Sequence, residues 1–176
     1  MAIKDSGDRT VFETGAVRDM RVGKGRCDLM PLALAQILID ADPKDLGPRN
    51  AGPLTHLEYF KESGFVVELR NAILAFHRES RYTSIYEMML DVSHHFEEGC
   101  EKYGENNWQK GIPVHCYVDS AARHYLKWRR GDEDERHDRA FVWNVMCAWW
   151  TCGHIYEMHE YARKDDCDST EAVYGA

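Results

Sequence analysis

The sequence predicts an all-α protein, a compact bundle of about five helices. Apolar residues recur at steps of three and four along several segments, and no alternating run of strand length appears. Glycines such as Gly104 and Gly131 stand where these patterns stop, as glycines often do at helix ends. A chain of 176 residues is long enough to bury one core and too short for two independent ones. We therefore expect residues 1–176 to form a single domain.

The expected helices follow one another along the chain. Asp28 can cap a first helix that has Pro31 in its first turn. The later apolar stripes predict helices over 54–76, 85–103 and 118–128, and a last one from near Asp132 to about Tyr161. Prolines and glycines in residues 42–53 predict a loop, and the polar residues after Lys164 predict a frayed end.

The composition narrows the class of protein. With 44% hydrophobic and 30% charged residues the chain is globular, and no apolar run approaches the ~20 residues that span a bilayer, so we expect no membrane partner. The first residues lack a secretory pattern, which favours the cytoplasm. Six cysteines without a C-x-x-C pair indicate free thiols rather than a zinc site. A net charge of -8 disfavours binding to a nucleic-acid duplex.

Two acidic clusters are candidates for a metal site. Glu98 and Glu101 are three residues apart, so they lie on one side of a helix and can offer carboxylates to one ion. If the last helix begins near residue 132, Asp134, His137 and Asp138 share about a third of its circumference. Carboxylates facing each other across two helices suit Mg²⁺, which also keeps waters and binds phosphate. The alternative is that these charges are a solvated surface at a helix start.

Two neighbours refine this second cluster. Glu135 lies on its flank, and Asn144 lies two turns beyond His137 on the same stripe of an otherwise apolar helix. A buried polar side chain needs a partner, so a second polar residue above the histidine favours a site over a core histidine bonded to a carbonyl.

Basic residues supply candidates for phosphate binding. Arg123 is four residues after Asp119, so it is either one half of a surface ion pair or a phosphate clamp that Asp119 or His124 orients. In residues 1–30, Lys24 and Arg26 accompany glycines whose backbone N–H groups can approach a phosphate. The spacing of these glycines is not that of a Walker loop.

Several motifs together make the chain resemble a known family, the phage-type dATP/dGTP diphosphohydrolases, which are relatives of the MazG group. The motifs are Gly15-Ala-x-Arg18-Asp19, Gly23-Lys-Gly-Arg26-x-Asp28-Leu-x-Pro31, Glu98-Gly-x-x-Lys102-Tyr-Gly104-x-x-Asn107-Trp108, Tyr117-x-Asp119-Ser-x-x-Arg123-His124, Asp134-x-x-His137 and Trp143-Asn144. The resemblance is close over residues 96–150, which we expect to be the catalytic core helices. Residues 42–95 depart most from the pattern and are expected to be an insertion.

The resemblance implies an activity and a metal. Such an enzyme hydrolyses a nucleoside triphosphate, dATP or dGTP, to the monophosphate and pyrophosphate with Mg²⁺ or Mn²⁺, and a histidine ligand shifts the preference toward Mn²⁺ or Co²⁺. In the all-α pyrophosphatases, E-x-x-E on one helix faces E-x-x-D on the next. Glu98 and Glu101 match the first motif. For the second, Glu135 and Asp138 compete with Asp134 and His137, which we favour together with Asn144.

The resemblance also implies roles for individual residues. Glu98, with Asp119 and His137, is expected to orient or deprotonate the attacking water. The residues expected to bind the substrate are Lys24, Arg26, Lys102, Tyr103, Asn107, Trp108, Arg123, His124 and Asn144. Relatives form homodimers or homotetramers, which we expect here too, in the host cytoplasm if a phage encodes the chain. The competing hypotheses are a protein that binds or sequesters a nucleotide without turnover, and a helical structural protein.

Overall fold

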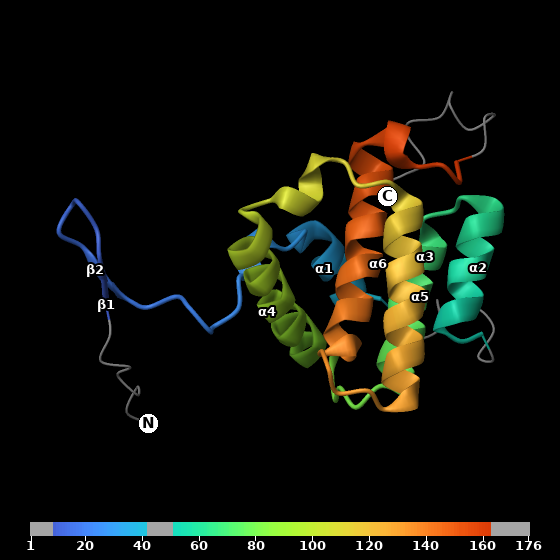
Figure 1. Ribbon diagram of the computed structural model, residues 1–176, viewed down its shortest axis with the longest axis horizontal. Helices are drawn as coiled ribbons and strands as arrows, with labels where there is room; N and C mark the ends of the chain where they lie inside the picture. Colours follow the sequence, from blue (N-terminus) through green and yellow to red (C-terminus); the bar gives the residue numbers. More distant parts are fainter. Residues whose placement is uncertain (1–8, 42–50, 163–176) are drawn as a thin grey trace.

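The computed structural model describes residues 9–41 and 51–162 and confirms the all-α fold (Figure 1). Within these residues the α-helices are α1 (Leu32–Ile39), α2 (Pro53–Ser63), α3 (Val67–Glu79), α4 (Ile85–Tyr103), α5 (Val114–Arg130) and α6 (His137–His154). Short 3-10 turns lie at Cys27–Leu29, Asn107–Lys110 and Tyr156–Met158. Most of the loop expected at 42–53, and the end expected to fray after Lys164, lie outside the described residues.

Among residues 9–41 and 51–162 the strands are confined to a small hairpin near the N-terminus. β1 (Arg9–Val11) pairs with β2 (Val17–Asp19) in antiparallel register, with Arg9 opposite Asp19. The hairpin stands away from the helices at the left of Figure 1. Val11 and Val17 are 69% and 55% exposed, so the described helices do not cover this hairpin.

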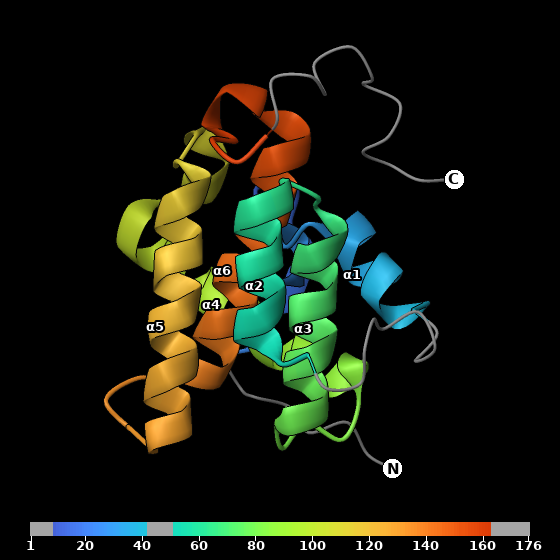
Figure 2. The same cartoon turned by 90° about the vertical axis from the view of Figure 1, so that its right-hand side faces the viewer.

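Helix α6 is the centre of the core. It contacts α3, α4 and α5, and α2 packs on α3 and α5 (Figures 1 and 2). Phe141 and Met146 of α6 are fully buried, as are Phe76 of α3 and Met88 of α4. Burial of such large side chains supplies the main stabilisation of a bundle of this size. A helix that is buried on most sides positions its polar residues in the interior, where each needs a partner.

One segment that was expected to be a single helix forms two helices. The stripe over 54–76 is interrupted between α2 and α3, where Gly64 has a φ of 75° in the left-handed region. A Cβ at Gly64 would lie 2.5 Å from the backbone oxygen of Tyr161. Only glycine fits this turn, which folds α3 back against α2 and gives six helices where about five were expected.

The first and last helices begin later than predicted. Asp28 does not cap α1. It lies in the 3-10 turn and accepts hydrogen bonds from Arg26 at 2.8 and 2.9 Å, while α1 begins after Pro31. The last helix begins at His137 rather than near Asp132, and it ends at His154. The acidic residues before His137 therefore lie in the connection from α5 and not on a helix face.

The middle helices follow the prediction closely. Ser84 caps α4 by accepting a hydrogen bond from the backbone N–H of Glu87 at 3.2 Å, and α4 ends at Gly104. Helix α5 starts four residues before the predicted boundary at 118 and ends at Gly131, which has a φ of 85°. Among the described residues no helix combines the length and apolar character needed to cross a membrane.

Candidate functional site

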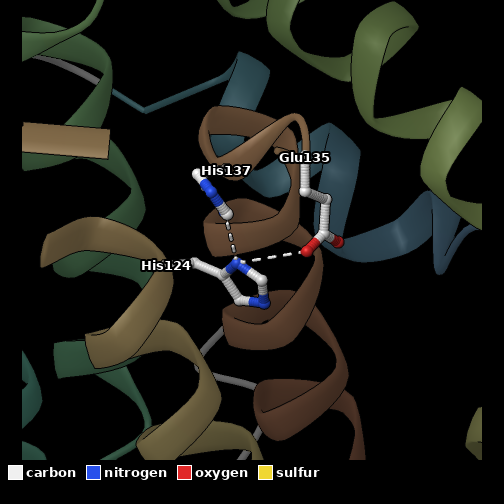
Figure 3. A group of neighbouring side chains, drawn as sticks. All are labelled: His124, Glu135 and His137. Carbon is white, nitrogen blue, oxygen red and sulfur yellow. Dashed lines mark hydrogen bonds and ion pairs between the residues drawn. The ribbon is translucent and has the colours of Figure 1, made fainter. Parts of the chain in front are cut away.

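Two histidines and a glutamate converge where α5 lies beside the start of α6 (Figure 3). The Nδ1 atoms of His124 and His137 are 3.0 Å apart, and a carboxylate oxygen of Glu135 lies 3.9 Å from Nδ1 of His124. His137 is buried and its neighbour His124 half-buried. Imidazole nitrogens and a carboxylate at this spacing are a donor set for a divalent transition metal.

The same histidine belongs to a second group of potential ligands. Nε2 of His137 is 2.9 Å from Asp134, and Asp132 lies within the same small volume. Lys127 donates to the other oxygen of Asp134 at 2.7 Å. This hydrogen bond and that from His137 hold the pKa of Asp134 well below its usual range, so the carboxylate stays charged. Asp134 thus fixes the orientation of the His137 ring, as outer carboxylates do at metal sites.

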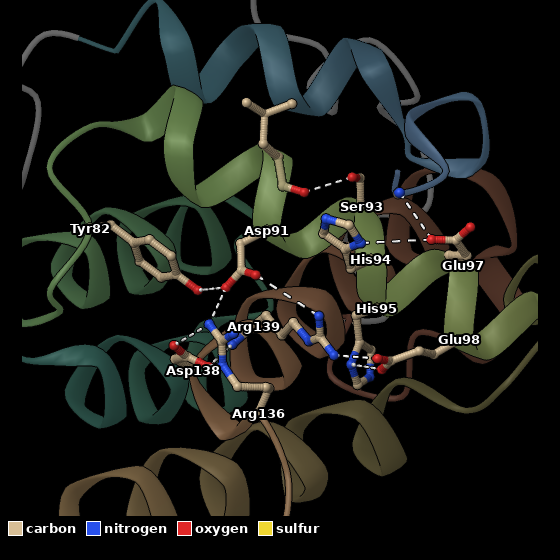
Figure 4. Close-up of polar contacts among 12 residues, drawn as sticks. Tyr82, Asp91, Ser93, His94, His95, Glu97, Glu98, Arg136, Asp138 and Arg139 are labelled. Carbon is tan, nitrogen blue, oxygen red and sulfur yellow. Dashed lines mark hydrogen bonds and ion pairs between the residues drawn. The ribbon is translucent and has the colours of Figure 1, made fainter. Parts of the chain in front are cut away.

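A third histidine joins this group to α4. Burial lowers the pKa of His95, while the negative charges of Glu135 and Glu98 oppose that effect. Glu98 forms an ion pair with Arg139 of α6, and its carboxylate is 3.7 Å from Nδ1 of His95 (Figure 4). That buried Nδ1 has no hydrogen-bond partner among the described residues. His95 is therefore a neutral imidazole with an unused polar atom.

A pocket of about 350 Å³ opens beside these polar groups. It is bounded by α4, the 3-10 turn after it, α5 and α6, and its lining is mostly apolar or aromatic. Four of the predicted substrate-binding residues line it, namely Tyr103, Asn107, Trp108 and Asn144. Pockets for small ligands have volumes of roughly 300–1,000 Å³ and an apolar lining with a few polar groups. The size and lining are those of a site for a small ligand.

The pocket and the histidine group share a wall. Trp143 lines the pocket, and its ring lies 5.3 Å from that of His95. Ser120, which also lines the pocket, accepts a hydrogen bond from Arg123 at 3.0 Å. Arg123 forms an exposed ion pair with Asp119 at 2.7 Å. A ligand bound in the pocket therefore has histidines and an arginine at its edge.

The remaining basic candidate on α4 lies at the rim. Lys102 is over the ring of Tyr103, with its Nζ 5.0 Å from the ring centroid. A hydrogen bond with Tyr103 raises the pKa of Lys102 above its usual value, so the side chain stays charged.

A comparison with known families bears on this arrangement. The model of the family described as dATP/dGTP diphosphohydrolase, N-terminal, matches residues 79–161. This part of the chain is similar to that family, in agreement with the motifs that it shares with the dATP/dGTP diphosphohydrolases. The matched segment runs from the last residue of α3 to beyond α6, so it contains the histidine group and the pocket. The description names a diphosphohydrolase activity. No curated protein and no solved structure matches the chain.

Within the matched segment the structure divides the residues of the two competing registers: Asp134 and Glu135 both lie beside His137, whereas Asp138 lies apart. Asp134 contacts His137. Asp138 instead accepts a hydrogen bond from Arg136 at 3.0 Å (Figure 4) and another from Arg81 at 3.1 Å. Burial acts to raise the pKa of Asp138, but hydrogen bonds from Arg136 and from the backbone N–H of Arg139, together with the charges of Arg136 and Arg81, outweigh it and the pKa is lowered. Asp138 is an ionised carboxylate that arginines already satisfy.

Part of the glycine-rich loop before α1 is bound to the fold. The backbone N–H groups of Gly23 and Gly25 donate to Glu97 of α4 at 2.9 and 3.0 Å. Lys24 pairs with Asp19 at 3.7 Å, and Arg26 pairs with Asp28 and Glu105. These glycine N–H groups therefore serve a carboxylate of this chain rather than facing a phosphate, and the structure does not bring Lys24 or Arg26 to the histidine group.

Other differences from the predicted site concern α4. Glu101 is exposed and, among the described residues, belongs to neither group of closely spaced ligand atoms. The sequence reasoning missed His95, Asp91 and Arg139. His95 has a signal that was available, because it lies three residues before Glu98 and therefore on the same side of α4. Arg139 had none, since its partner Glu98 is 41 residues away in the chain.

Proposed function

We propose that the protein is a metal-dependent diphosphohydrolase that converts dATP or dGTP to the monophosphate and pyrophosphate. One observation carries the proposal: within the segment that matches the diphosphohydrolase family, a ligand-sized pocket shares the Trp143 wall with a group of histidines and carboxylates. If the nucleobase occupies the pocket, the phosphates of the same nucleotide would extend toward that group. The basic side chain of Arg123 at the pocket edge suits the charge of a triphosphate.

The donor set fits a divalent ion. His124, Glu135 and His137 offer atoms within 4.8 Å of one another, with Asp134 behind His137. Burial lowers the pKa of His124, against the effect of Glu135, so its ring is neutral and can donate a lone pair. Two nitrogen donors favour Mn²⁺ over Mg²⁺, which prefers oxygen. When bound, such an ion neutralises phosphate charge and makes water more acidic.

The chain's own residues supply the proton acceptor. The neutral His95 ring, with an unpartnered buried Nδ1, is suited to accept a proton from the attacking water. Glu98, next to that nitrogen, would orient the ring and stabilise its charged form, which extends the role expected for this glutamate. Arg139 keeps Glu98 in place through an ion pair.

The pocket lining favours a purine. The indole N–H groups of Trp108 and Trp143 are buried without a hydrogen-bond partner among the described residues. A purine presents acceptors such as N7, and O6 in guanine, that can satisfy such donors. Asn107 and Asn144 add amide groups, and Tyr103 offers an exposed ring for stacking.

The test is product analysis. The purified chain is incubated with each dNTP and NTP in Mg²⁺ or Mn²⁺, and nucleotides and pyrophosphate are quantified. We expect monophosphate and pyrophosphate in equimolar amounts from dATP and dGTP, faster with Mn²⁺. Glu135→Gln and His95→Gln should each lower kcat at least about 100-fold, the scale of losing a directly acting group.

A matched variant controls for the change of charge. Glu133 is two residues away in the same connection and is exposed, so Glu133→Gln should leave kcat within about twofold. Equal activity of the Glu133 and Glu135 variants would contradict the assigned ligand group. Release of phosphate alone would contradict the proposed cleavage between the α- and β-phosphates.

A second candidate function has support from two ion pairs. Lys127 and Arg139 bind Asp134 and Glu98, so cations of the chain already neutralise two of the carboxylates expected at the site. A protein that binds a nucleotide without hydrolysing it does not need these carboxylates to be free for a metal. It would raise its melting temperature with dATP or dGTP while every nucleotide survives a long incubation with metal.

The chain is further proposed to form a homodimer or homotetramer. The hairpin supports this, because Val11 and Val17 on its two three-residue strands are exposed, as is Phe12 directly after β1, and an isolated hairpin is marginal in water. Light scattering at micromolar concentration should give twice or four times the mass of 20.4 kDa. A monomeric mass would refute it.

A further inference from the structure

A cysteine, a histidine and a glutamate are in contact at the start of α5, apart from the proposed metal group. Nε2 of His115 lies 3.4 Å from Sγ of Cys116, and Nδ1 of the same ring lies 2.8 Å from Glu160. The backbone N–H of His115 also donates to Glu160 at 3.3 Å. Glu160 comes from beyond α6, 45 residues along the chain, so only the fold brings these three together.

The hydrogen bonds fix the state of the ring. Burial acts to raise the pKa of Glu160, but hydrogen bonds that include those from His115 outweigh it and lower the pKa. An ionised carboxylate only accepts hydrogen bonds, so Nδ1 of His115 carries the proton. In the neutral ring Nε2 then has a free lone pair, and it faces the thiol of Cys116. A base beside a thiol, oriented by a third group, is the arrangement of an activated nucleophile.

The surroundings of the sulfur favour negative charge on it. Cys116 is the third residue of α5, where the helix dipole stabilises an anion. Tyr117 and Tyr161 lie close enough to Cys116 for its charge to affect their pKa. The pKa of both tyrosines is raised, and the main cause is burial. Both rings are neutral at pH 7, so neither tyrosine places a negative charge beside the sulfur.

The other described cysteines differ from Cys116. Cys147 and Cys152 are buried, and burial raises the pKa of both thiols, which makes them inert. Cys27 is exposed like Cys116, but the structure gives it no histidine partner among the described residues. Cys116 alone in this set is exposed, paired with a histidine and part of the pocket lining.

We propose that Cys116 is a nucleophilic thiol, activated by His115 and Glu160, that reacts with small soft electrophiles and thereby places a substituent in the wall of the pocket. In the reaction with an alkyl iodide, Nε2 of His115 takes the thiol proton and the sulfur forms a bond to carbon. The carbon–iodine bond breaks and iodide leaves with its electron pair. The proton then passes from His115 to water.

A regulatory consequence rests on the proposed function. If the pocket holds the nucleobase, a substituent on Cys116 competes with the nucleotide for space, and bound nucleotide shields the sulfur. The protein's activity would then fall when electrophiles modify this one side chain. The chemistry of the thiol itself needs no nucleotide and is tested without one.

The experiment measures alkylation of the full chain by iodoacetamide at pH 7, with peptide mass spectrometry to follow Cys116 and Cys27 in the same sample. We expect Cys116 to react at least ten times faster than Cys27. In denaturant the two rates should become similar, because Glu160 no longer orients the ring.

Variants identify the activating groups. His115→Gln should bring the rate at Cys116 down to that at Cys27, and Glu160→Gln should lower it about threefold, with partial rescue in Glu160→Asp. The matched controls are His154→Gln and Glu157→Gln, both exposed near the end of α6, which should change neither rate. Melting temperatures confirm that each variant is folded.

The outcomes separate this proposal from the proposed function. Equal rates at Cys116 and Cys27 in the native chain, or a fast rate that survives in His115→Gln, would overturn the activated thiol. Fast alkylation that dGTP slows supports both proposals. Fast alkylation that dGTP leaves unchanged supports the thiol and counts against the pocket as the nucleobase site.

Discussion

Two pairs of neighbouring residues, one on α4 and one at the start of α6, show the same division. Glu97 binds the N–H groups of the glycine-rich loop, while Glu98 faces His95 and Arg139. His137 contacts His124, while Asp138 is held by arginines on the other side. In each pair one side chain fixes the fold and its neighbour is part of the candidate site.

The physical reason is the geometry of the helix. Successive residues are rotated by about 100° around a helix, so in each of these two pairs the adjacent side chains leave the helix in different directions and meet different partners. A cluster of charged residues in a sequence is therefore divided by the helix into sides with different partners. Motif spacing therefore selects a group of candidate site residues, and the partners on each side of the helix decide which of these residues are structural.

The largest expected effect is on stability, from Asp138. Asp138→Ala should lower the free energy of unfolding by about 3 kcal/mol, because it removes a buried carboxylate that accepts hydrogen bonds from Arg136 and Arg81. Urea denaturation measures it, with Glu133→Ala as an exposed control expected within about 0.5 kcal/mol. A loss below about 1 kcal/mol would mean that Asp138 contributes no more than an exposed acid, which would contradict its assignment to the fold.

The α4 pair should separate stability from activity. Glu97→Gln should cost about 1–2 kcal/mol of stability, since the amide keeps one acceptor for two N–H donors and loses the charge. Glu98→Gln should change stability by less than about 0.5 kcal/mol, as expected for an exposed ion pair, but lower kcat by more than tenfold. If Glu97→Gln has the larger effect on kcat, the assignment within this pair is wrong.

A pH series tests the contribution of histidines that are buried in the fold. Burial lowers the pKa of His77 and His159 in the folded chain. In the unfolded chain these histidines have a pKa of about 6.5, so as the pH falls the unfolded chain is protonated there before the folded chain is. The free energy of unfolding is therefore not reduced by these two histidines above about pH 6.5, and it falls as the pH drops below that value. We expect a loss of about 1 kcal/mol between pH 7 and 5.5 by urea denaturation. His159→Gln should flatten the curve, and the exposed His154→Gln should not.

The smallest effect is expected where both partners are in water. The Asp119 and Arg123 side chains are 74% and 53% exposed, so Asp119→Asn should change the free energy of unfolding by only about 0.3 kcal/mol. Adding salt should make even this difference vanish. A change above about 1 kcal/mol would mean that the Asp119–Arg123 pair belongs with the buried arginine contacts of Asp138.

Much of the fold followed from local pattern. The ends of α4 at Gly104 and of α5 at Gly131 were predictable because a left-handed or open backbone at a helix end requires glycine, and the apolar stripes are features of single helices. The break at Gly64 was missed because its reason, the backbone of Tyr161, is almost a hundred residues away. Asp132 was placed in a helix because acidic residues are common in first turns.

Short-range spacing in the sequence was enough to predict the fold class and the residue types of the candidate site, and it favoured Asp134 with His137 over the competing pair. Only the tertiary structure decided which candidates meet. Helix α6 presses His137 against His124 and turns Asp138 toward Arg81, and α4 brings His95 to the same place. These contacts join residues far apart in the chain, and their partners are set by how the helices pack rather than by any local preference.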